Sequence, residues 1–341
     1  MRRDRPGRLG RAGVILGVLA ALASFGGAAT GPWVANDQAR VRLVAGLDRA
    51  EAGGDPALGV EFVLAPGWHV YWKNAGDAGY PPELVPAADG ALAAATLRYP
   101  APHRYELPGD LVAFGYEDRV IYPLDARLRA GLPAGPVSLA ARIDYLVCAE
   151  SCIPYAADLT LDLEIGSPLE DADTAAALRD WRARLPVEAG SAGAPSAETR
   201  LTTSSTGGGL ELVVELSGQG LSAAAPDLFF EPHPSVSFGR PRFVASAAGP
   251  GFRVAVEPVD RTKPLPDPLA VAWTATGFET AGDAPLAVED RVELARPAAA
   301  AEERRPAPFV ALGAVAFAFL VLFLIRRFGG GRPAPASHPS T

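Results

Sequence analysis

The chain has 341 residues, with 39 acidic and 31 basic side chains, a formal net charge of −8 and two cysteines. Both ends are basic, so the long region between them is more acidic than the total suggests. This charge excludes binding to a nucleic-acid backbone as the main function. The sequence also lacks the motifs of serine hydrolases, zinc proteases, phosphate-binding loops and dinucleotide-binding folds.

The first 29 residues predict a secretory signal peptide. A head with five arginines is followed by an apolar run from Ala12 to Phe25 and by small residues at 27–29. This order is typical of an export signal, and the run is too short and too rich in glycine for a spanning helix. Lysine is rare beside arginine and alanine, as in proteins of GC-rich bacteria. We therefore expect export to the bacterial periplasm, where disulfides form and persist.

Residues 38–166 predict a first β-sandwich domain. In the segment 159–165, four aliphatic residues alternate with Thr160, Asp162 and Glu164, which is the pattern of a strand with one buried face. Turns rich in glycine and proline separate several such segments, and no stretch keeps a helical period. These features predict an antiparallel sandwich.

Residues 167–196 predict a helix and a linker. Ser167 and Pro168 suit the start of a helix, and acidic residues follow them. Residues 197–296 are strand-like again and contain no cysteine, so they predict a second sandwich without an evident site. The expected fold class is therefore all-β, with two sandwiches in tandem.

The C-terminal part predicts a membrane anchor. Phe309 to Ile325 carries no charge and approaches the ~20 residues that cross the hydrocarbon core. We expect a stalk at 297–306, a transmembrane helix at 307–327 that lies in the lipid bilayer, and a disordered cytoplasmic tail at 328–341. With the signal peptide, this arrangement predicts a single-pass protein of the bacterial inner membrane, with its large N-terminal region in the periplasm.

Both cysteines, Cys148 and Cys152, lie between two strand-like runs. Residues four apart in one extended strand are separated by ~13 Å, too far for a disulfide. A bond therefore requires a turn at 149–151, which would place the two cysteines opposite each other in a hairpin. Such a small loop removes only about 2 kcal/mol of chain entropy. This geometry leaves a redox pair and a structural staple equally open.

A metal site is the less favoured interpretation of the same pair. His69 and His103 could complete a zinc site, because two thiolates alone underfill one. Met1 is the only methionine, so the chain has no methionine-rich surface for copper. We therefore expect neither a bound metal nor a cofactor.

Four blocks of sequence resemble the DsbD-like N-terminal domain family, in particular its ScsB-type members. They follow in the same order over about 90 residues. The first block is PGWHVYWKNAGDAGYPPE, and the others are YPAPHR, FGYED and DYLVC followed by CIP, at residues 66–83, 99–104, 114–118, 144–148 and 152–154. ScsB-type proteins also carry a second sandwich, which suits residues 197–296.

The resemblance implies an immunoglobulin-like sandwich that shuttles electrons in the periplasm. Carried over by position, Cys148 and Cys152 would be the redox pair. Phe114, Gly115 and Tyr116 would correspond to a cap loop, with Phe114 as a lid over the sulfurs. An aromatic lid would exclude small thiols and oxidants until the right partner docks.

The expected function is a membrane-anchored periplasmic thiol–disulfide exchange module, of the protein-disulfide reductase type if it acts as an enzyme. The single predicted spanning segment has no cysteine, so we expect a separate membrane protein to donate the electrons. The expected acceptors are periplasmic thioredoxin-like or other thiol proteins. The alternatives are a non-enzymatic binding module with a structural disulfide, or a copper- or zinc-binding protein.

Overall fold

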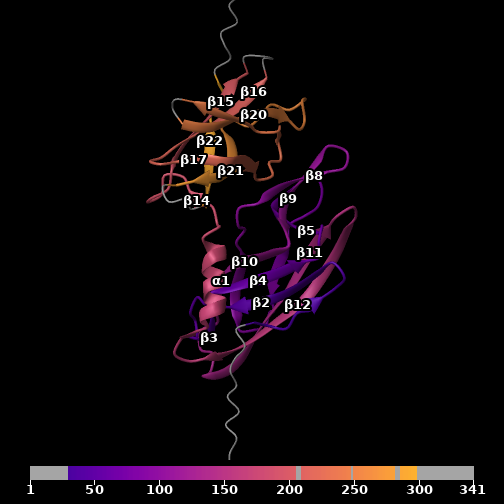
Figure 1. Cartoon of the computed structure of the whole chain (residues 1–341), viewed down its shortest axis with the longest axis vertical. Coiled ribbons are helices and arrows are strands. Elements are labelled where there is room, and N and C mark those ends of the chain that lie inside the picture. Colours follow the sequence, from indigo (N-terminus) through magenta and orange to yellow (C-terminus); the bar gives the residue numbers. More distant parts are fainter. Residues whose placement is uncertain (1–29, 205–208, 247–248, 281–284, 298–341) are drawn as a thin grey trace, which may run out of the picture.

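A computed structural model describes residues 30–204, 209–246, 249–280 and 285–297. In these ranges the chain is mostly β, as expected, and forms four sheets and one helix. Figure 1 shows two bodies stacked along the long axis, the first indigo to magenta and the second orange to yellow. The predicted signal peptide, transmembrane helix and tail lie outside the described residues. Within the described ranges, no helix is long and apolar enough to span a membrane.

The first body is a sandwich of two sheets whose facing side chains form one core. Phe62 lies near its centre, with its ring edge-to-face against Tyr122 and Tyr145. One sheet has the order β1 (Val34–Ala35), β2 (Ala39–Ala45), β4 (Leu58–Leu64), β10 (Arg119–Leu128) and β7 (Leu92–Leu97). The other has the order β13 (Leu169–Glu170), β3 (Leu47–Ala50), β12 (Cys152–Ile165), β11 (Gly135–Cys148), β5 (His69–Gly76), β9 (Leu111–Glu117) and β8 (His103–Leu107), with β6 (Glu83–Pro86) on β11.

The longest element of the first sandwich is the hairpin of β11 and β12. Its register runs without a shift from the pair Gly135 and Ile165 to the pair Cys148 and Cys152. Alternate residues of β12 are buried near its C-terminal end, because one face of the strand packs on the core. At its tip, β11 also pairs with β5, which places the cysteine end of the hairpin inside the sheet.

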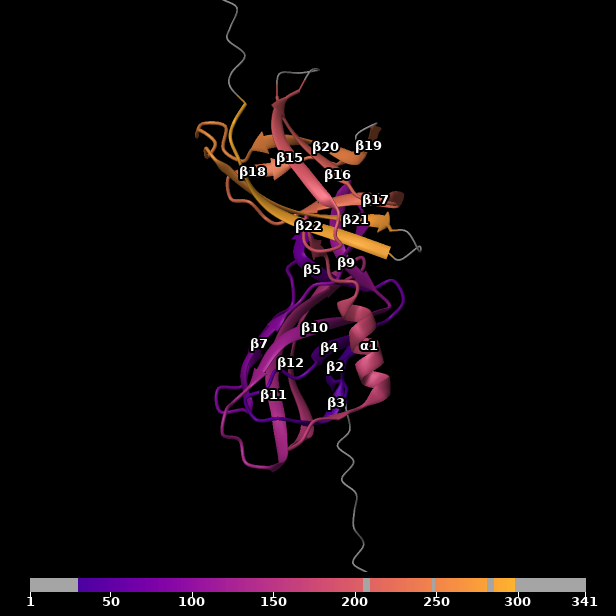
Figure 2. The same ribbon diagram turned by 90° about the vertical axis from the view of Figure 1, so that its left-hand side faces the viewer.

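Helix α1 (Ala172–Arg182) connects the two bodies along the side of the first sandwich (Figure 2). Its side chains Ala175, Leu178 and Trp181 are buried. The helix begins later than the sequence indicated, because residues 169–170 pair with β3 as an edge strand. Asp171 then acts as the N-cap, and its side chain accepts a hydrogen bond from the backbone N–H of Thr174.

The second body is also a sandwich, with Trp273, Phe252 and Phe278 in its core. One of its sheets has the order β14 (Val187–Glu188), β22 (Pro285–Leu294), β21 (Leu269–Glu279) and β17 (Ser222–Phe230). The other has the order β15 (Ser196–Thr203), β16 (Leu210–Ser217), β20 (Gly249–Pro258) and β18 (Val236–Phe238), with β19 (Arg242–Ser246) on β20.

The two sandwiches contact each other through strand β17. Its Phe229 packs within the core of the first sandwich, where its ring meets Phe114 at 5.1 Å and Trp72 at 5.9 Å between centroids. Beside this ring, Arg104 of the first sandwich forms an ion pair with Asp227 of the second. The second sandwich is therefore packed onto β5, β8 and β9 of the first.

Candidate functional site

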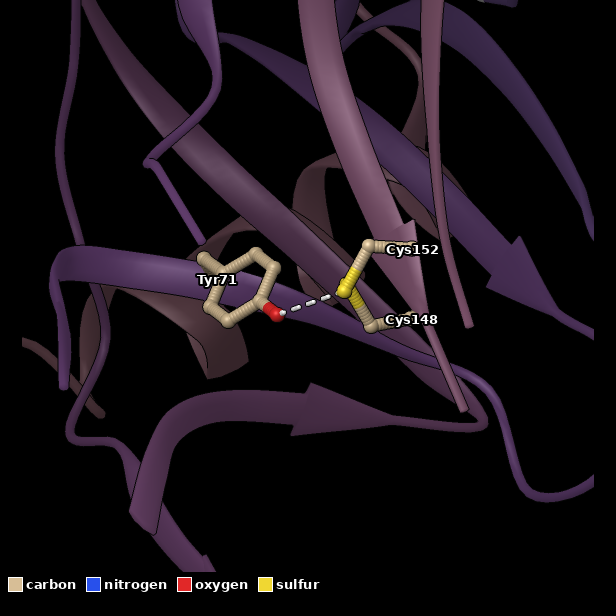
Figure 3. Close-up of a disulfide and its surroundings, with 3 residues drawn as sticks. All are labelled: Tyr71, Cys148 and Cys152. Atoms are coloured by element: carbon tan, nitrogen blue, oxygen red, sulfur yellow. Dashed lines mark hydrogen bonds between the residues drawn. A yellow bond between two sulfur atoms is a disulfide. The ribbon is translucent and has the colours of Figure 1, made fainter. Parts of the chain in front are cut away.

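Cys148 and Cys152 form a disulfide across the tip of the β11–β12 hairpin (Figure 3). They are directly opposed in the register, and their Cα atoms are 4.1 Å apart. Residues 149–151 make the three-residue loop that the spacing of the cysteines predicted. The hairpin thus holds the two sulfurs at bonding distance without help from any distant segment.

The two ends of this disulfide have different surroundings. Cys148 is 1% exposed and belongs to a small apolar cluster with Tyr71, Ala113 and Leu146, separate from the main core. Cys152 is exposed. Because a thiol partner must reach the sulfur that it attacks, the exposure of the Cys152 residue favours Cys152 over the buried Cys148 as the cysteine that a partner meets first.

The hydroxyl group of Tyr71 points at the disulfide. Its oxygen lies 3.8 Å from Sγ of Cys152 (Figure 3). A disulfide sulfur carries no proton, so Tyr71 is the donor of this contact. Burial raises the pKa of Tyr71 to about 12, so the hydroxyl keeps its proton. Gly79 leaves room for the ring, since a Cβ there would lie 2.3 Å from it.

His69 lies beside Cys148 in the sheet. It is the register partner of Cys148 on β11 and of Glu117 on β9. Its ring stacks on Tyr105 at 5.4 Å and meets Tyr71 edge-to-face at 5.2 Å. The side chain is buried, and Nε2 has no hydrogen-bond partner among the described residues. Burial also lowers the pKa of His69, so the imidazole is neutral at neutral pH.

We predict that His69 makes the folded chain less stable in acid. Above about pH 6.5 the imidazole is neutral in both the folded and the unfolded chain, so it adds no pH dependence. Below that pH the unfolded chain binds a proton that the buried ring, with its lowered pKa, does not bind. Stability therefore falls as the pH drops toward the folded pKa.

A His69→Gln variant should lose less stability between neutral and acidic pH than the wild type, measured by urea unfolding. The facing groups Glu117, Tyr71, Tyr105 and Cys148 are unchanged in this comparison. His103→Gln is the matched control, because His103 is exposed. An acid-induced loss of equal size in wild type and His69→Gln would contradict the prediction.

The residues expected to form a cap loop lie in strand β9 instead of a loop. Phe114 packs in the main core against Phe229, whereas its neighbour Ala113 faces the cysteine cluster. Neighbouring residues of a strand point to opposite faces, so the structure does not bring Phe114 to the disulfide. Tyr116 is buried and donates a hydrogen bond to the Pro100 carbonyl. A lid function of residues 114–116 stays a prediction.

Sequence reasoning did not identify Tyr71, and it considered His69 only as a metal ligand or, more often, as an ordinary surface or packed side chain. The available signal was the alternation in a strand, which places residues 69 and 71 on one face. Their pairing with the cysteines was not available, because it depends on the neighbouring strand. Among the described residues, no cluster of three or more His, Cys, Asp or Glu side chains could hold a metal ion.

These features define an immunoglobulin-like sandwich with a disulfide at the tip of a hairpin, one end accessible and the other buried. Residues 35–164 match the family described as "Thiol:disulfide interchange protein DsbD, N-terminal". This part of the chain is therefore a DsbD-like N-terminal domain, as the sequence blocks indicated.

The fold is similar to a solved structure, the N-terminal periplasmic domain of ScsB from Proteus mirabilis. The TM-score is 0.59 at 22% sequence identity, and the match covers 79% of this chain and 99% of that chain. The likeness therefore extends beyond residues 35–164 into the second sandwich. No curated protein matches the sequence.

Proposed function

We propose that this protein is a periplasmic thiol–disulfide exchange module that works through Cys148 and Cys152. The observation that carries the proposal is the asymmetric disulfide within the DsbD-like domain, with Cys148 buried and Cys152 exposed. A disulfide with a purely structural role would add little to the free energy of unfolding, because the loop that it closes is so short.

The exposure of Cys152 supports one order for the chemistry. An incoming thiolate attacks Sγ of Cys152, a mixed disulfide forms, and the electron pair of the broken S–S bond leaves on Cys148 as a thiolate. In the opposite direction, the thiolate of Cys152 attacks a partner disulfide, and Cys148 then resolves the mixed disulfide. The hydroxyl of Tyr71 can donate a hydrogen bond to the sulfur of Cys152, which favours its thiolate form.

The wider setting follows from the sequence and completes the proposal. Residues 1–29 direct export, and residues 307–327 anchor the chain in the inner membrane with a short cytoplasmic tail. A separate membrane protein supplies electrons, and periplasmic thioredoxin-like or other thiol proteins exchange them with Cys152. In this proposal the first β-sandwich domain comprises residues 38–166 and the second comprises residues 197–296.

The full chain, expressed in bacteria, tests the assignment of the two cysteines. Cys148→Ser leaves the exposed Cys152 without its resolving partner, so we expect a mixed disulfide with a thioredoxin-like protein to accumulate. Cys152→Ser leaves only the buried thiol and should accumulate much less adduct. Non-reducing electrophoresis followed by mass spectrometry measures both. Absence of adduct from Cys148→Ser, or equal amounts from the two variants, would count against the proposal.

A further inference from the structure

We propose that His69 is the acid–base group that serves Cys148 during exchange, with Glu117 as the residue that orients it. This inference rests on the proposed function and adds a catalytic residue to it. It depends on a row of side chains across four neighbouring strands.

The row runs from β12 to β9. The register pairs Cys152 with Cys148, Cys148 with His69, and His69 with Glu117. Residues directly opposite each other in antiparallel strands project to the same face, with Cβ atoms ~4.5–5.5 Å apart. The register therefore places Cys148, His69 and Glu117 at neighbouring positions on one face of the sheet, and a thiol, an imidazole and a carboxylate in this order are the groups that activate a cysteine nucleophile.

The hydrogen bonding of His69 is incomplete while the disulfide is formed. His69 is only 3% exposed, and its Nε2 atom is buried without a hydrogen-bond partner among the described residues. A buried polar atom without a partner is costly, and such atoms call for a functional explanation. A disulfide sulfur has no proton to donate to this nitrogen, whereas the reduced Cys148 thiol has one. In the proposed mechanism, reduction gives Cys148, the register partner of His69, a thiol proton that Nε2 can accept.

The aromatic neighbours hold the imidazole in place but cannot replace it as a base. Tyr105 of β8 stacks on the ring, and Tyr71 of β5 meets it edge-on. Burial raises the pKa of both phenols, Tyr71 to about 12, so neither accepts a proton readily at neutral pH. Glu117 of β9 is exposed and is the register partner of His69 on the side opposite Cys148, so we assign to its carboxylate the orientation of the ring.

The step balances as a proton and electron-pair transfer. In the mixed disulfide between Cys152 and a partner, neutral His69 accepts the S–H proton of Cys148. The resulting thiolate attacks Sγ of Cys152, the Cys148–Cys152 bond forms, and the partner leaves as a thiolate with the electron pair of the broken bond. The imidazolium then gives its proton to the partner thiolate or to water. In the reductive direction, neutral His69 first takes the proton of the incoming partner thiol or of water, and the imidazolium formed in this way protonates the departing Cys148 thiolate.

Dithiobis(nitrobenzoate) separates the two steps in one stopped-flow trace. The reduced full chain should release nitrothiobenzoate first when Cys152 attacks the reagent, and again when Cys148 resolves the mixed disulfide. We expect His69→Phe to slow the second release by at least about tenfold at neutral pH and to leave the first within about twofold. The variant's second rate should also rise about tenfold per pH unit, since only the free thiolate reacts.

Further variants make the test specific. His69→Gln keeps a polar side chain that cannot accept a proton, so it should be slow as well, and it serves if His69→Phe does not fold. His103→Phe makes the same change at an exposed histidine and should alter neither release. Glu117→Gln should slow only the second release, by less than His69→Phe.

The outcomes distinguish this inference from the proposed function. A second release of wild-type rate in folded His69→Phe or His69→Gln would overturn the role of His69, and an unchanged rate in Glu117→Gln would overturn that of Glu117. Failure of the wild type to release nitrothiobenzoate twice would instead count against the exchange function itself.

Discussion

Replacing Phe229 by alanine should lower the free energy of unfolding by about 3–5 kcal/mol. The side chain is 1% exposed, and although it belongs to the second sandwich it packs in the core of the first. Its ring contacts Phe114 and Trp72, and the guanidinium of Arg104 lies 5.2 Å from its centroid. Alanine would leave a cavity between β17 and the sheet that carries Phe114, Trp72 and Arg104.

Urea unfolding followed by tryptophan fluorescence measures this effect, because each sandwich has a buried tryptophan, Trp72 and Trp273. The variant should unfold at lower urea concentration, with the two sandwiches less strongly coupled. Phe243→Ala is the matched control, since Phe243 lies in the same sandwich but is 41% exposed. Its effect should stay within about 0.5 kcal/mol. An unchanged midpoint for Phe229→Ala would show that the two sandwiches do not share a core.

The parts of the fold that depend on local pattern could be predicted. Alternation of aliphatic and polar residues in 159–165 indicated strand β12, and that alternation is the burial pattern observed there. The turn at 149–151 followed from the geometry of an extended chain. Two cysteines four positions apart in one strand are too far apart to form a disulfide unless the chain reverses direction between them. Both arguments use only residues that are neighbours in sequence.

The parts that depend on distant pairing could not be predicted. His69 and Cys148 are far apart in sequence, and only the register of β5 on β11 brings them together. Phe114 could equally have faced the disulfide, since an apolar side chain suits either face of a buried strand. Its partner Phe229 lies in the other sandwich, so no pattern within residues 38–166 could indicate its direction. Residues 169–170 likewise join a sheet edge that the sequence does not reveal.

The hairpin of β8 and β9 contacts the second sandwich with some of its side chains and the cysteine site with others. On β8, Arg104 faces the second sandwich, while its neighbour Tyr105 stacks on His69. On β9, Phe114 faces Phe229, while its neighbour Ala113 lies in the cysteine cluster. The second sandwich therefore packs on the reverse side of the strands that line the disulfide. We infer that its contacts help to hold the position of Tyr105, and through it the ring of His69.

Arg104→Ala should test this arrangement with a loss of about 2–4 kcal/mol in stability. Nε and Nη2 of Arg104 donate to the two carboxylate oxygens of Asp227 at 2.8 and 2.9 Å, and Nη2 also donates to the Leu228 carbonyl at 3.1 Å. The Arg104 side chain is only 14% exposed and that of Asp227 is 28% exposed. Removal of the guanidinium leaves a partly buried carboxylate without its charge partner, and partial solvation keeps the cost below that of a fully buried pair.

Arg98→Ala is the control for Arg104→Ala, because it breaks an ion pair with Asp125 in which both side chains are about half exposed. That loss should be below about 1 kcal/mol. The decisive measurement is the rate at which dithiothreitol reduces the disulfide under native conditions. If β8 transmits the interdomain contact, Arg104→Ala should change this rate and Arg98→Ala should not. A destabilised Arg104→Ala protein that is reduced at the wild-type rate would show that the contact joins the two sandwiches without influencing the cysteine site.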